Sequence, residues 1–592
     1  MNIFFMFRKP NLVPFSLKFE ILSLICTNLC YKIKPTNIIM EISPNKTLLD
    51  YFYHWEATTP NKIYLRQPFD DDFVDYTYKE VGQQARSLAA YLKSLNLPSK
   101  SNIGLVSKNC AEWLIADFAI MMSGHISVPF YATLTDAQIN QVLTHSACEV
   151  LFVGKLDDWS GMKSGIPDKV KCISFPTYNP DSSHMQWNDI LANHSPMTEN
   201  YLPNLEDIFT IIYTSGTTGN PKGVMLKYGA MASVIYHTYD IAKLHTENAR
   251  FFSYLPLCHI AERNIIEAAA ITMGATIYFA ETLDSFAKNL AAAEPTHFLA
   301  VPRIWTKFQL GILGKMPEKK LNTLLKIPIL NSIVKKKIRK GLGLDKAIVI
   351  LTGAAPMPNS LIVWFRKLGI IIQEAYGMTE NVGAVCMMPK EHVKDGTVGK
   401  IYPGMEVKIA EGSGEILTRS NWNMDGYYKE PELTAETIDS DNWIHTGDVG
   451  ELDAENYLKI TGRVKEMYKT SKGEYVAPSQ IEFGFADNNF IEQICVVGNH
   501  LPQPIGLLVL SDLGKATDKQ VVRESLETTL KEVNPKLKSY ERVQKLVVLR
   551  EPWTIENNKM TPTLKIKRNI IEKEFAPKVD AWYNKSEAVI WE

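Results

Sequence analysis

The chain has 592 residues, of which 45% are hydrophobic and 22% charged, an ordinary composition for a soluble globular enzyme with large cores. Basic residues number 64 and acidic residues 65, and this balance argues against a nucleic-acid binder. The eight cysteines are scattered without a CxxC pair or a His/Cys cluster, so neither a zinc site nor a disulfide framework is indicated. Reduced thiols in a cytoplasmic compartment fit this pattern best.

The first 40 or so residues differ in character from the rest of the chain. Residues 12–30 are apolar but are interrupted by two charged residues, and no small-residue cleavage site comes after them. We expect residues 1–44 to be a disordered or artefactual extension, with Met40 as an alternative start. A weak membrane-associating helix is the other interpretation.

From residue 47 onward, helical and extended patterns alternate, which predicts a mostly parallel α/β sheet. We expect helices over residues 48–56, 109–122, 138–146 and 231–244, a hairpin over 64–76, and strands over 103–106, 128–131, 150–153 and 208–212. Residues 304–346 should be a helical region, apolar over 324–334 and ending in a basic run over 335–340. Such a segment is either a membrane-surface helix or an ordinary solvated face.

The most specific pattern is Tyr-Thr-Ser-Gly-Thr-Thr-Gly-Asn-Pro-Lys-Gly over residues 213–223, directly after the strand expected at 208–212. Glycines let backbone N–H groups approach an anion closely, hydroxyls add donors, and the lysine supplies positive charge. The proline before the lysine and the glycine after it distinguish the stretch from a Walker A loop. We expect a phosphate cradle rather than an ordinary turn, formed by Thr214, Ser215, Gly216, Thr217, Thr218, Gly219 and Lys222.

Two later segments carry groups suited to the rest of a nucleotide. Small residues after a strand expected at 347–351 leave room for a flat ring to lie on the backbone of Gly353, Ala354 and Ala355. Residues 373–380 come after a strand expected at 369–372 and combine an aromatic ring, a hydroxyl and a carboxylate. These groups suit stacking, a phosphate contact and a Mg²⁺ contact, through Tyr376, Gly377, Thr379 and Glu380.

A third segment, residues 444–448, ends in Asp448, whose carboxylate can accept hydrogen bonds from both ribose hydroxyls. A Gly-Arg-Val-Lys run is found next at 462–465, which by itself would be an ordinary charged linker.

Taken together, these motifs resemble the signatures of the adenylate-forming superfamily, which includes acyl-CoA synthetases, luciferases and peptide-synthetase adenylation domains. The resemblance covers about residues 45–575 and includes a Leu-Pro-Leu-Cys-His segment that ends at His259. Near the C-terminus, Thr-Leu-Lys at residues 563–565 replaces the Ser-Gly-Lys of many members and looks like the long-chain acyl-CoA synthetase branch. Asn-Trp-Asn at 421–423 departs from the usual family pattern.

The resemblance implies further roles for single residues. It places His259 near the acyl site, although a lone histidine is more often a packed core residue. Other implied roles are a second ribose contact by Arg463, a domain hinge at Lys465, the catalytic lysine at Lys565, Mg²⁺ contacts by Glu380 and Thr214, and a thioester-forming loop that contains Lys469 and Gly473.

The implied fold is α/β. A large N-terminal adenylate-forming domain over 45–462 would combine mostly parallel sheets, flanking helices and a small β-barrel-like subdomain. A small mobile α+β C-terminal domain would occupy 465–592.

The implied enzyme is an AMP-forming acid–thiol ligase that uses ATP and Mg²⁺ to activate a long-chain fatty acid as an acyl-adenylate. It would then transfer the acyl group to coenzyme A and release AMP and pyrophosphate. Two alternatives stay open: an adenylation enzyme that serves a carrier protein or another acceptor, and an inactive nucleotide-binding scaffold. Peripheral contact with a membrane surface and a homodimer are also open, and no nucleic-acid partner is expected.

Overall fold

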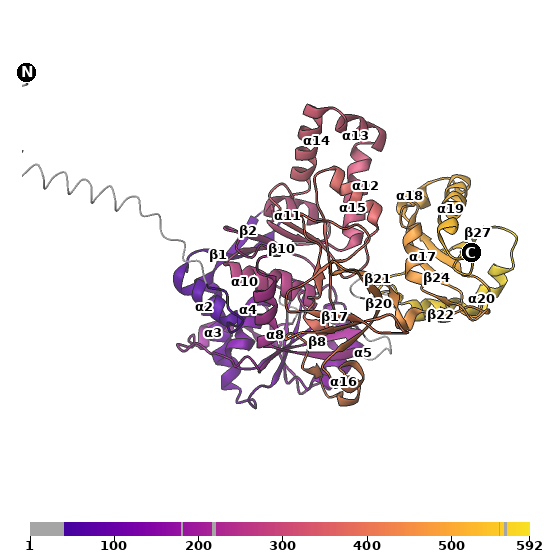
Figure 1. Ribbon diagram of the computed structural model, residues 1–592. Helices are drawn as coiled ribbons and strands as arrows, with labels where there is room; N and C mark the ends of the chain where they lie inside the picture. The colour runs from indigo at the N-terminus through magenta and orange to yellow at the C-terminus, as the bar shows by residue number, and fades with distance from the viewer. Residues whose placement is uncertain (1–40, 71, 179–180, 216–220, 556, 562–564) are drawn as a thin grey trace, which may run out of the picture. The chain divides into compact units, whose positions relative to one another are not determined.

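The computed structural model describes residues 41–70, 72–178, 181–215, 221–555, 557–561 and 565–592. Pro44–Glu592 form one compact unit (Figure 1). Of the expected N-terminal extension, residues 1–40 lie outside the described residues. Six cysteines fall in the described part of the chain, and all six are free thiols.

An eight-stranded sheet carries the hairpin that leads into the glycine-rich stretch. Its order is β19-β9-β8-β4-β3-β5-β6-β7. The pairs from β8 to β7 are parallel, whereas β9 is antiparallel to both β8 and β19. The strands are β3 (Asn102–Val106), β4 (Ile126–Phe130), β5 (Val150–Val153), β6 (Lys171–Ser174), β7 (Met185–Gln186), β8 (Ile208–Ser215), β9 (Pro221–Lys227) and β19 (Gly426–Tyr427).

A thirteen-stranded sheet runs in the order β17-β18-β20-β21-β16-β15-β14-β13-β12-β10-β11-β1-β2. Its centre, from β14 to β1, is parallel, and its outer strands are antiparallel. The central strands and the β1–β2 hairpin are β1 (Ile63–Phe69), β2 (Asp72–Thr77), β10 (Arg250–Ser253), β11 (Thr276–Phe279), β12 (His297–Leu299), β13 (Val349–Thr352) and β14 (Gln373–Tyr376). The strands expected as a small β subdomain continue this sheet as β15 (Cys386–Met387), β16 (Gly399–Ile401), β17 (Glu406–Ile409), β18 (Glu415–Arg419), β20 (Ile444–Leu452) and β21 (Tyr457–Arg463).

Helices connect and cover these strands, as the alternating pattern predicts. Three of them begin at a threonine capping box, which satisfies two of the free N–H groups at the helix start. The helices that precede the insert are α2 (Leu48–Thr58), α3 (Tyr78–Ser94), α4 (Ala111–Met122), α5 (Asp136–Ser146), α6 (Trp159–Lys163), α7 (Trp187–Asn193), α8 (Tyr228–Thr238), α9 (Ile260–Glu262), α10 (Ala269–Met273) and α11 (Phe286–Ala293). The expected helical insert is present as α12 (Pro302–Lys315), α13 (Glu318–Leu325) and α14 (Pro328–Gly341), with α13 beside α14 (Figure 1). Helices α15 (Asn359–Lys367) and α16 (Pro431–Thr437) come later in the chain.

A buried ion pair ties the two sheet systems together near the candidate site. Every residue of α4 is buried, and its Asp117 accepts two hydrogen bonds, at 3.0 and 2.9 Å, from the Arg263 guanidinium. Both side chains are fully buried, and the hydroxyl of Ser127 in β4 also donates to Asp117. Arg263 begins the π-helical turn Arg263–Ala268, so this pair fixes the backbone just after His259. Because a buried charge without its partner is costly, the two side chains depend on each other.

The C-terminal region has its own sheet, in the order β24-β25-β26-β27, with a hydrophobic cluster on each face. One cluster joins the sheet to α17 (Pro478–Phe485) and α19 (Lys519–Val533), and the other joins it to α20 (Arg568–Tyr583). Alternation along the strands sends Val496 to the first cluster and Cys495 and Val497 to the second. The remaining elements are β22 (Tyr468–Lys469), β23 (Tyr475–Val476), α18 (Asp512–Ala516), β24 (Ile491–Val497), β25 (Ile505–Leu510), β26 (Leu546–Val548) and β27 (Val589–Trp591).

Two sequence-based elements are wrong in their bounds. The strand expected at 369–372 is absent from its place, because Gly369 (φ +76°) instead ends α15 in a left-handed cap, with the Ile370 N–H donating to the Phe365 carbonyl. Strand β14 therefore coincides with the motif at 373–376 instead of preceding it. The helix expected at 231–244 is α8, which ends at Thr238; the chain then turns, with Lys243 at φ +54°.

Candidate active site

The β8–β9 hairpin brings two of the predicted phosphate-binding residues face to face. Thr214 and Lys222 are direct partners in the antiparallel ladder, one on each side of the connecting loop. The backbone of Ser215 ends β8. The predicted contacts of Gly216, Thr217, Thr218 and Gly219 lie outside the described residues.

Lys222 lies against an aromatic side chain that also contacts the predicted magnesium ligand. Its ammonium is 5.2 Å from the centroid of the Tyr427 ring, and the Tyr427 hydroxyl donates to Glu380 Oε1 at 2.7 Å. Desolvation lowers the pKa of Lys222, and the positive charge of Lys465 lowers it further, while Glu380 acts in the opposite direction. The sequence motifs did not predict this position of Tyr427.

Backbone rather than side chain forms the turns after β13 and β14. A Cβ atom on Gly353 would lie 2.9 Å from the Ala375 carbonyl oxygen, and one on Gly377 would lie 2.2 Å from the carbonyl carbon of Gly383. Ala354 holds a left-handed conformation at φ +62°, a strained value for a residue with a side chain. Ala355 is exposed beside these turns, and the contact of a planar ring with this backbone stays a prediction. Thr379 and Glu380 come next, both buried in the short helix Thr379–Asn381.

Asp448 is a buried carboxylate held by two side chains. It is 5% exposed, and it faces Arg463 across the β20–β21 ladder, with Arg463 Nε 2.8 Å from Asp448 Oδ1. Its other oxygen accepts from the Tyr376 hydroxyl at 2.7 Å. Two carboxylate oxygens offer about four acceptor positions, so these contacts leave capacity for ribose hydroxyls.

Lys565 belongs to the same group of charges. The side chain is exposed to solvent, yet protein surrounds it closely enough that desolvation lowers its pKa. The nearby charge of Arg463 lowers this pKa further, whereas Asp448, Glu380 and Glu466 oppose the change. The structure thus brings Lys565 to the residues predicted for the nucleotide.

His259 also faces Lys565. Burial lowers the pKa of His259 to about 4, and the charge of Lys565 acts in the same direction, so the imidazole is neutral at pH 7. Its Nδ1 accepts from the Ala261 N–H at 3.2 Å, which assigns the ring proton to Nε2. His259 can therefore donate a hydrogen bond to an anionic or carbonyl oxygen from Nε2, but it cannot act there as a base.

A buried polar network that the sequence analysis missed positions the loop of His259. The Asn109 amide donates to the Leu255 carbonyl at 2.6 Å, and its oxygen accepts from the Leu257 N–H at 3.1 Å. Glu262, 1% exposed, accepts at Oε1 from Ser253, the Tyr254 N–H and Asn109. Burial raises the pKa of Glu262 to about 8. A lone asparagine and a lone glutamate carry no local signal, so only the folded chain reveals this network.

The residues predicted for the thioester-forming loop lie in a separate hairpin. Lys469 is in β22, with its ammonium 4.8 Å from the ring centroid of Tyr475 in β23. Gly473 forms the turn between these strands, with φ +82° and open space where a Cβ would be. This turn requires a glycine whether or not a ligand passes it. Lys465, the predicted hinge, lies in the short exposed helix Val464–Glu466.

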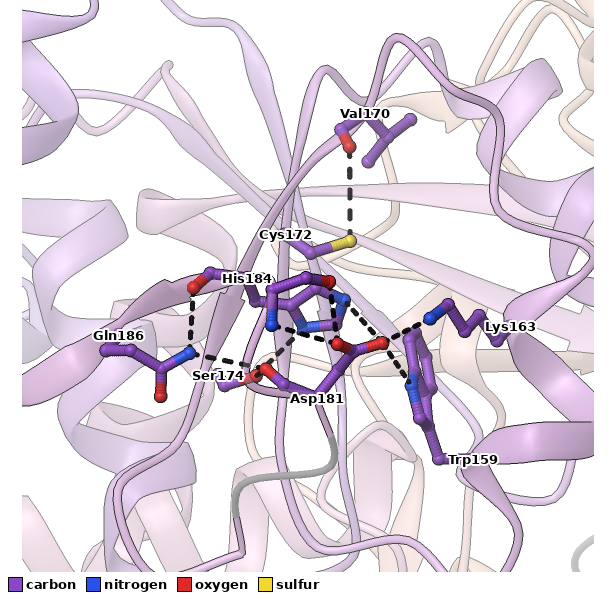
Figure 2. Close-up of polar contacts among 9 residues, drawn as sticks. Trp159, Lys163, Val170, Cys172, Ser174, Asp181, His184 and Gln186 are labelled. Atoms are coloured by element: carbon purple, nitrogen blue, oxygen red, sulfur yellow. Dashed lines mark hydrogen bonds and ion pairs between the residues drawn. The ribbon is translucent and has the colours of Figure 1, made fainter.

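A second polar cluster superficially resembles a hydrolytic triad (Figure 2). Ser174 Oγ lies 2.8 Å from His184 Nδ1, and His184 Nε2 lies 3.8 Å from Asp181, which also pairs with Lys163 at 2.5 Å. Ser174 is fully buried, so no substrate could reach its hydroxyl. The cluster therefore stabilises the chain between β6 and β7 and is not a catalytic site.

The arrangement around Asp448 suits an enzyme that binds an adenine nucleotide and holds a second anion beside its phosphates. Residues 52–428 match the family described as AMP-binding enzyme, and residues 466–587 match the AMP-binding enzyme C-terminal domain. The chain belongs to the AMP-binding enzyme family and is an adenylate-forming ligase, as the motifs predicted.

Curated relatives match along most of their length. The chain is 28% identical to the long-chain-fatty-acid–CoA ligase FadD15 of Mycobacterium bovis, over 90% of this chain and 96% of that protein. It is 29% identical to the peroxisomal long chain acyl-CoA synthetase 6 of Arabidopsis thaliana, over 91% of this chain and 86% of that protein. It is 26% identical to the long-chain-fatty-acid–CoA ligase ACSBG2 of Xenopus laevis, over 87% of this chain and 80% of that protein.

Solved structures share the fold at lower identity. The anthranilate CoA ligase AuaEII, in complex with anthranoyl-AMP, superposes with a TM-score of 0.74 at 20% identity, covering 91% of this chain and 99% of that one. The adenylation domain of a carboxylate reductase from Mycobacterium chelonae superposes with a TM-score of 0.76 at 20% identity, covering 97% of this chain and 98% of that one. The predicted α/β fold with a separate small C-terminal domain is confirmed.

The described helices include none that is both long and apolar enough to cross a membrane.

The raised pKa of Glu262 predicts that the folded protein loses stability as pH rises, and that Glu262→Gln removes this loss. Between about pH 4.5 and 8 the folded protein binds a proton at Glu262 that the unfolded chain has lost, so this group's stabilising contribution falls as pH rises. The loss is about 1.4 kcal/mol for each pH unit in that window. Glu262→Gln keeps the acceptor oxygen without the charge. We expect the difference in melting temperature, variant minus unsubstituted protein, to be about 3 °C larger at pH 8 than at pH 5.

Differential scanning calorimetry of both proteins at pH 5, 6.5 and 8 measures this difference. The matched control is Glu411→Gln, at an exposed glutamate, for which the difference should not change with pH. A pH-independent difference for Glu262→Gln would show that Glu262 stays ionised in the folded protein.

Proposed function

We propose that this protein activates a long-chain fatty acid with ATP to an acyl-adenylate and transfers the acyl group to coenzyme A. The observation that carries the proposal is the gathering of Lys565 with His259, Glu380, Asp448 and Arg463, residues from four distant parts of the chain. The names of the curated relatives, long-chain-fatty-acid–CoA ligases from bacteria, plants and animals, support the substrate class.

In this proposal the nucleotide lies across the carboxyl ends of β13 and β14, in keeping with the general preference of ligands for that edge of α/β sheets. The adenine would lie on the backbone around Gly353–Ala355, and the free acceptor positions of Asp448 would bind the ribose hydroxyls. Thr214, Lys222 and the loop between them would hold the phosphates.

Mg²⁺ fits the residues present. The ion prefers oxygen ligands and is usually held by one or two carboxylates together with substrate phosphates. Within the described ranges no group of three or more acidic, histidine or cysteine side chains could hold a metal, whereas Glu380 offers a single buried carboxylate beside Lys222. Glu380, with Thr214 opposite Lys222, would hold the ion, which would neutralise phosphate charge.

Acyl-adenylate formation is an in-line displacement. An oxygen of the fatty acid carboxylate attacks the α-phosphorus of ATP, and the bond from that phosphorus to the bridging oxygen of pyrophosphate breaks. Because two anions approach each other, charge compensation supplies most of the catalysis. In this proposal Lys565 would stabilise the charge shared between carboxylate and phosphate, and His259 Nε2–H would donate to an acyl oxygen.

In the second step the sulfur of coenzyme A attacks the acyl carbonyl carbon, AMP leaves, and the thiol proton passes to solvent. Lys469 and Gly473 lie in a hairpin for which the described residues show no contact with Asp448 or Glu380. We therefore propose that the C-terminal region rotates about Lys465 between the two steps, withdrawing Lys565 and presenting this hairpin. Exposed residues in short segments between larger elements, such as Lys465, absorb such backbone changes.

The first test is AMP release over a panel of acids from acetate to oleate, with and without coenzyme A. We expect release to depend on coenzyme A and to be fastest for acids with long chains. Release that does not need coenzyme A would indicate a carrier protein or another acceptor. No release with any acid would indicate a scaffold without activity, and either result contradicts the proposal.

The second test separates the two steps with neighbouring lysines. Lys565 faces the charges at the active site, whereas Lys567 Nζ donates to Asn558 Oδ1 at 2.5 Å. Loss of one charge-stabilising donor typically costs about 10²–10³ in rate. We therefore expect Lys565→Ala to slow acyl-adenylate formation by about that factor, but to convert pre-formed acyl-adenylate to thioester at nearly the normal rate.

Single-turnover kinetics of each step measures both effects, with Lys567→Ala as the matched control that leaves both rates nearly unchanged. Equal slowing of the two steps by Lys565→Ala would contradict the proposed rotation.

A further inference from the structure

The α13–α14 hairpin exposes a cluster of aliphatic side chains at its turn. We call this cluster the hairpin tip; it consists of Ile327, Ile329, Leu330 and Ile333, which are 44%, 77%, 37% and 57% exposed. Exposed apolar residues scattered singly need no explanation, but four within seven residues form a patch. The two helices lie side by side, and in Figure 1 they project from the rest of the unit.

The base of this hairpin is anchored, so the tip is held in place. Trp305 of α12 and Leu321 of α13 are buried in the core next to β12 and β13, and Val334 and Ile338 of α14 pack against the same core. Residues three to four apart share a face of a helix. Ile329 and Ile333 therefore form a second apolar stripe on α14, turned away from the stripe that packs.

Exposed lysines lie along both helices of the hairpin. Between residues 315 and 340 the sequence has nine basic residues and one acidic residue, Glu318, although the whole chain has a net charge of −1. Arg339 pairs with Asp345 at 3.4 Å. The exposed lysines near the tip, for which the described residues show no acidic partner, are Lys319, Lys320, Lys326, Lys336, Lys337 and Lys340. By helical spacing, Lys336, Lys337 and Lys340 share the exposed face of α14 with Ile329 and Ile333.

The chemistry of the patch favours a lipid surface over a macromolecular partner. Hot spots of protein interfaces are enriched in tryptophan, tyrosine and arginine, and RNA is recognised largely by aromatic stacking and arginine. Residues 326–333 contain none of these. They are aliphatic side chains beside lysines, which bind charge without directional requirements.

We propose that the hairpin tip inserts among the lipids of a negatively charged membrane surface while the surrounding lysines contact the anionic headgroups. Aliphatic side chains gain by leaving water for the acyl boundary, and lysines gain from the negative surface potential. This binding goes beyond the proposed ligase activity, because it needs neither ATP nor an acid.

Co-sedimentation of the full chain with phosphatidylcholine vesicles, with and without 30 mol% phosphatidylglycerol, tests the proposal. We expect binding to the anionic vesicles to be at least tenfold tighter than to neutral ones and to weaken between 50 and 500 mM salt. Ile329→Ser with Ile333→Ser should weaken binding to anionic vesicles at least tenfold. Lys336→Glu with Lys337→Glu and Lys340→Glu should do the same, since each lysine near such a surface contributes roughly a factor of five.

The C-terminal region offers matched controls with similar exposure. Leu513 and Val521 are each 49% exposed, and Lys519, Lys531 and Lys536 are exposed lysines on or beside α19. The double variant Leu513→Ser with Val521→Ser should leave vesicle binding unchanged. The triple variant Lys519→Glu with Lys531→Glu and Lys536→Glu should leave it unchanged as well. Melting temperatures of all variants report whether each one is folded.

Three results would overturn the proposal. The first is equal binding to neutral and anionic vesicles, and the second is unchanged binding by the folded tip variants, which would place any membrane contact elsewhere in the chain. The third is a preference for polyuridylate or an acidic peptide that the tip variants abolish.

Discussion

A carboxylate and a triphosphate repel each other, and the proposed reaction depends on overcoming that repulsion. Lys222, Lys465, Arg463 and Lys565 converge on one region. Burial lowers the pKa of Lys222 and the charge of Lys465 lowers it further; burial also lowers the pKa of Lys565, and the charge of Arg463 adds to that shift. Cations that destabilise one another in the free protein are suited to a ligand of opposite charge. Mutual repulsion of this kind is expected at functional sites, which give up stability for binding.

The scaffold holds these charges through contacts between segments that are distant in sequence. Asp448 connects Tyr376 of β14 with Arg463 of β21, and Tyr427 of β19 connects Glu380 with Lys222 of β9. The Asp448 contacts lie within the thirteen-stranded sheet, whereas the Tyr427–Glu380 hydrogen bond joins the segment after β14 to the eight-stranded sheet. The loop of His259 is held in the same way by Asn109 and Glu262. A substitution far from the nucleotide can thus displace a group that touches it.

The family could be predicted from the sequence because its strongest signals are local. Glycine and hydroxyl residues near Lys222, small residues at 353–355 and an acidic residue at Asp448 each report their chemistry within a few positions. The contacts of Tyr427, Asn109 and Glu262 could not be predicted, since a single polar residue says nothing about a partner 40 or more residues away. The strand placed at 369–372 failed for a local reason: its apolar run is the end of a helix cap, and periodicity alone does not distinguish the two.

The central claim, that this chain makes an acyl-adenylate before any thiol is involved, is tested most directly by isotope exchange. Labelled pyrophosphate should enter ATP when a long-chain fatty acid and Mg²⁺ are present and coenzyme A is absent. Asp448→Asn, which weakens the acceptor proposed for the ribose, should raise the ATP concentration needed for half-maximal exchange. Exchange that requires coenzyme A, or ATP consumption that yields ADP and phosphate instead of AMP and pyrophosphate, would contradict the account.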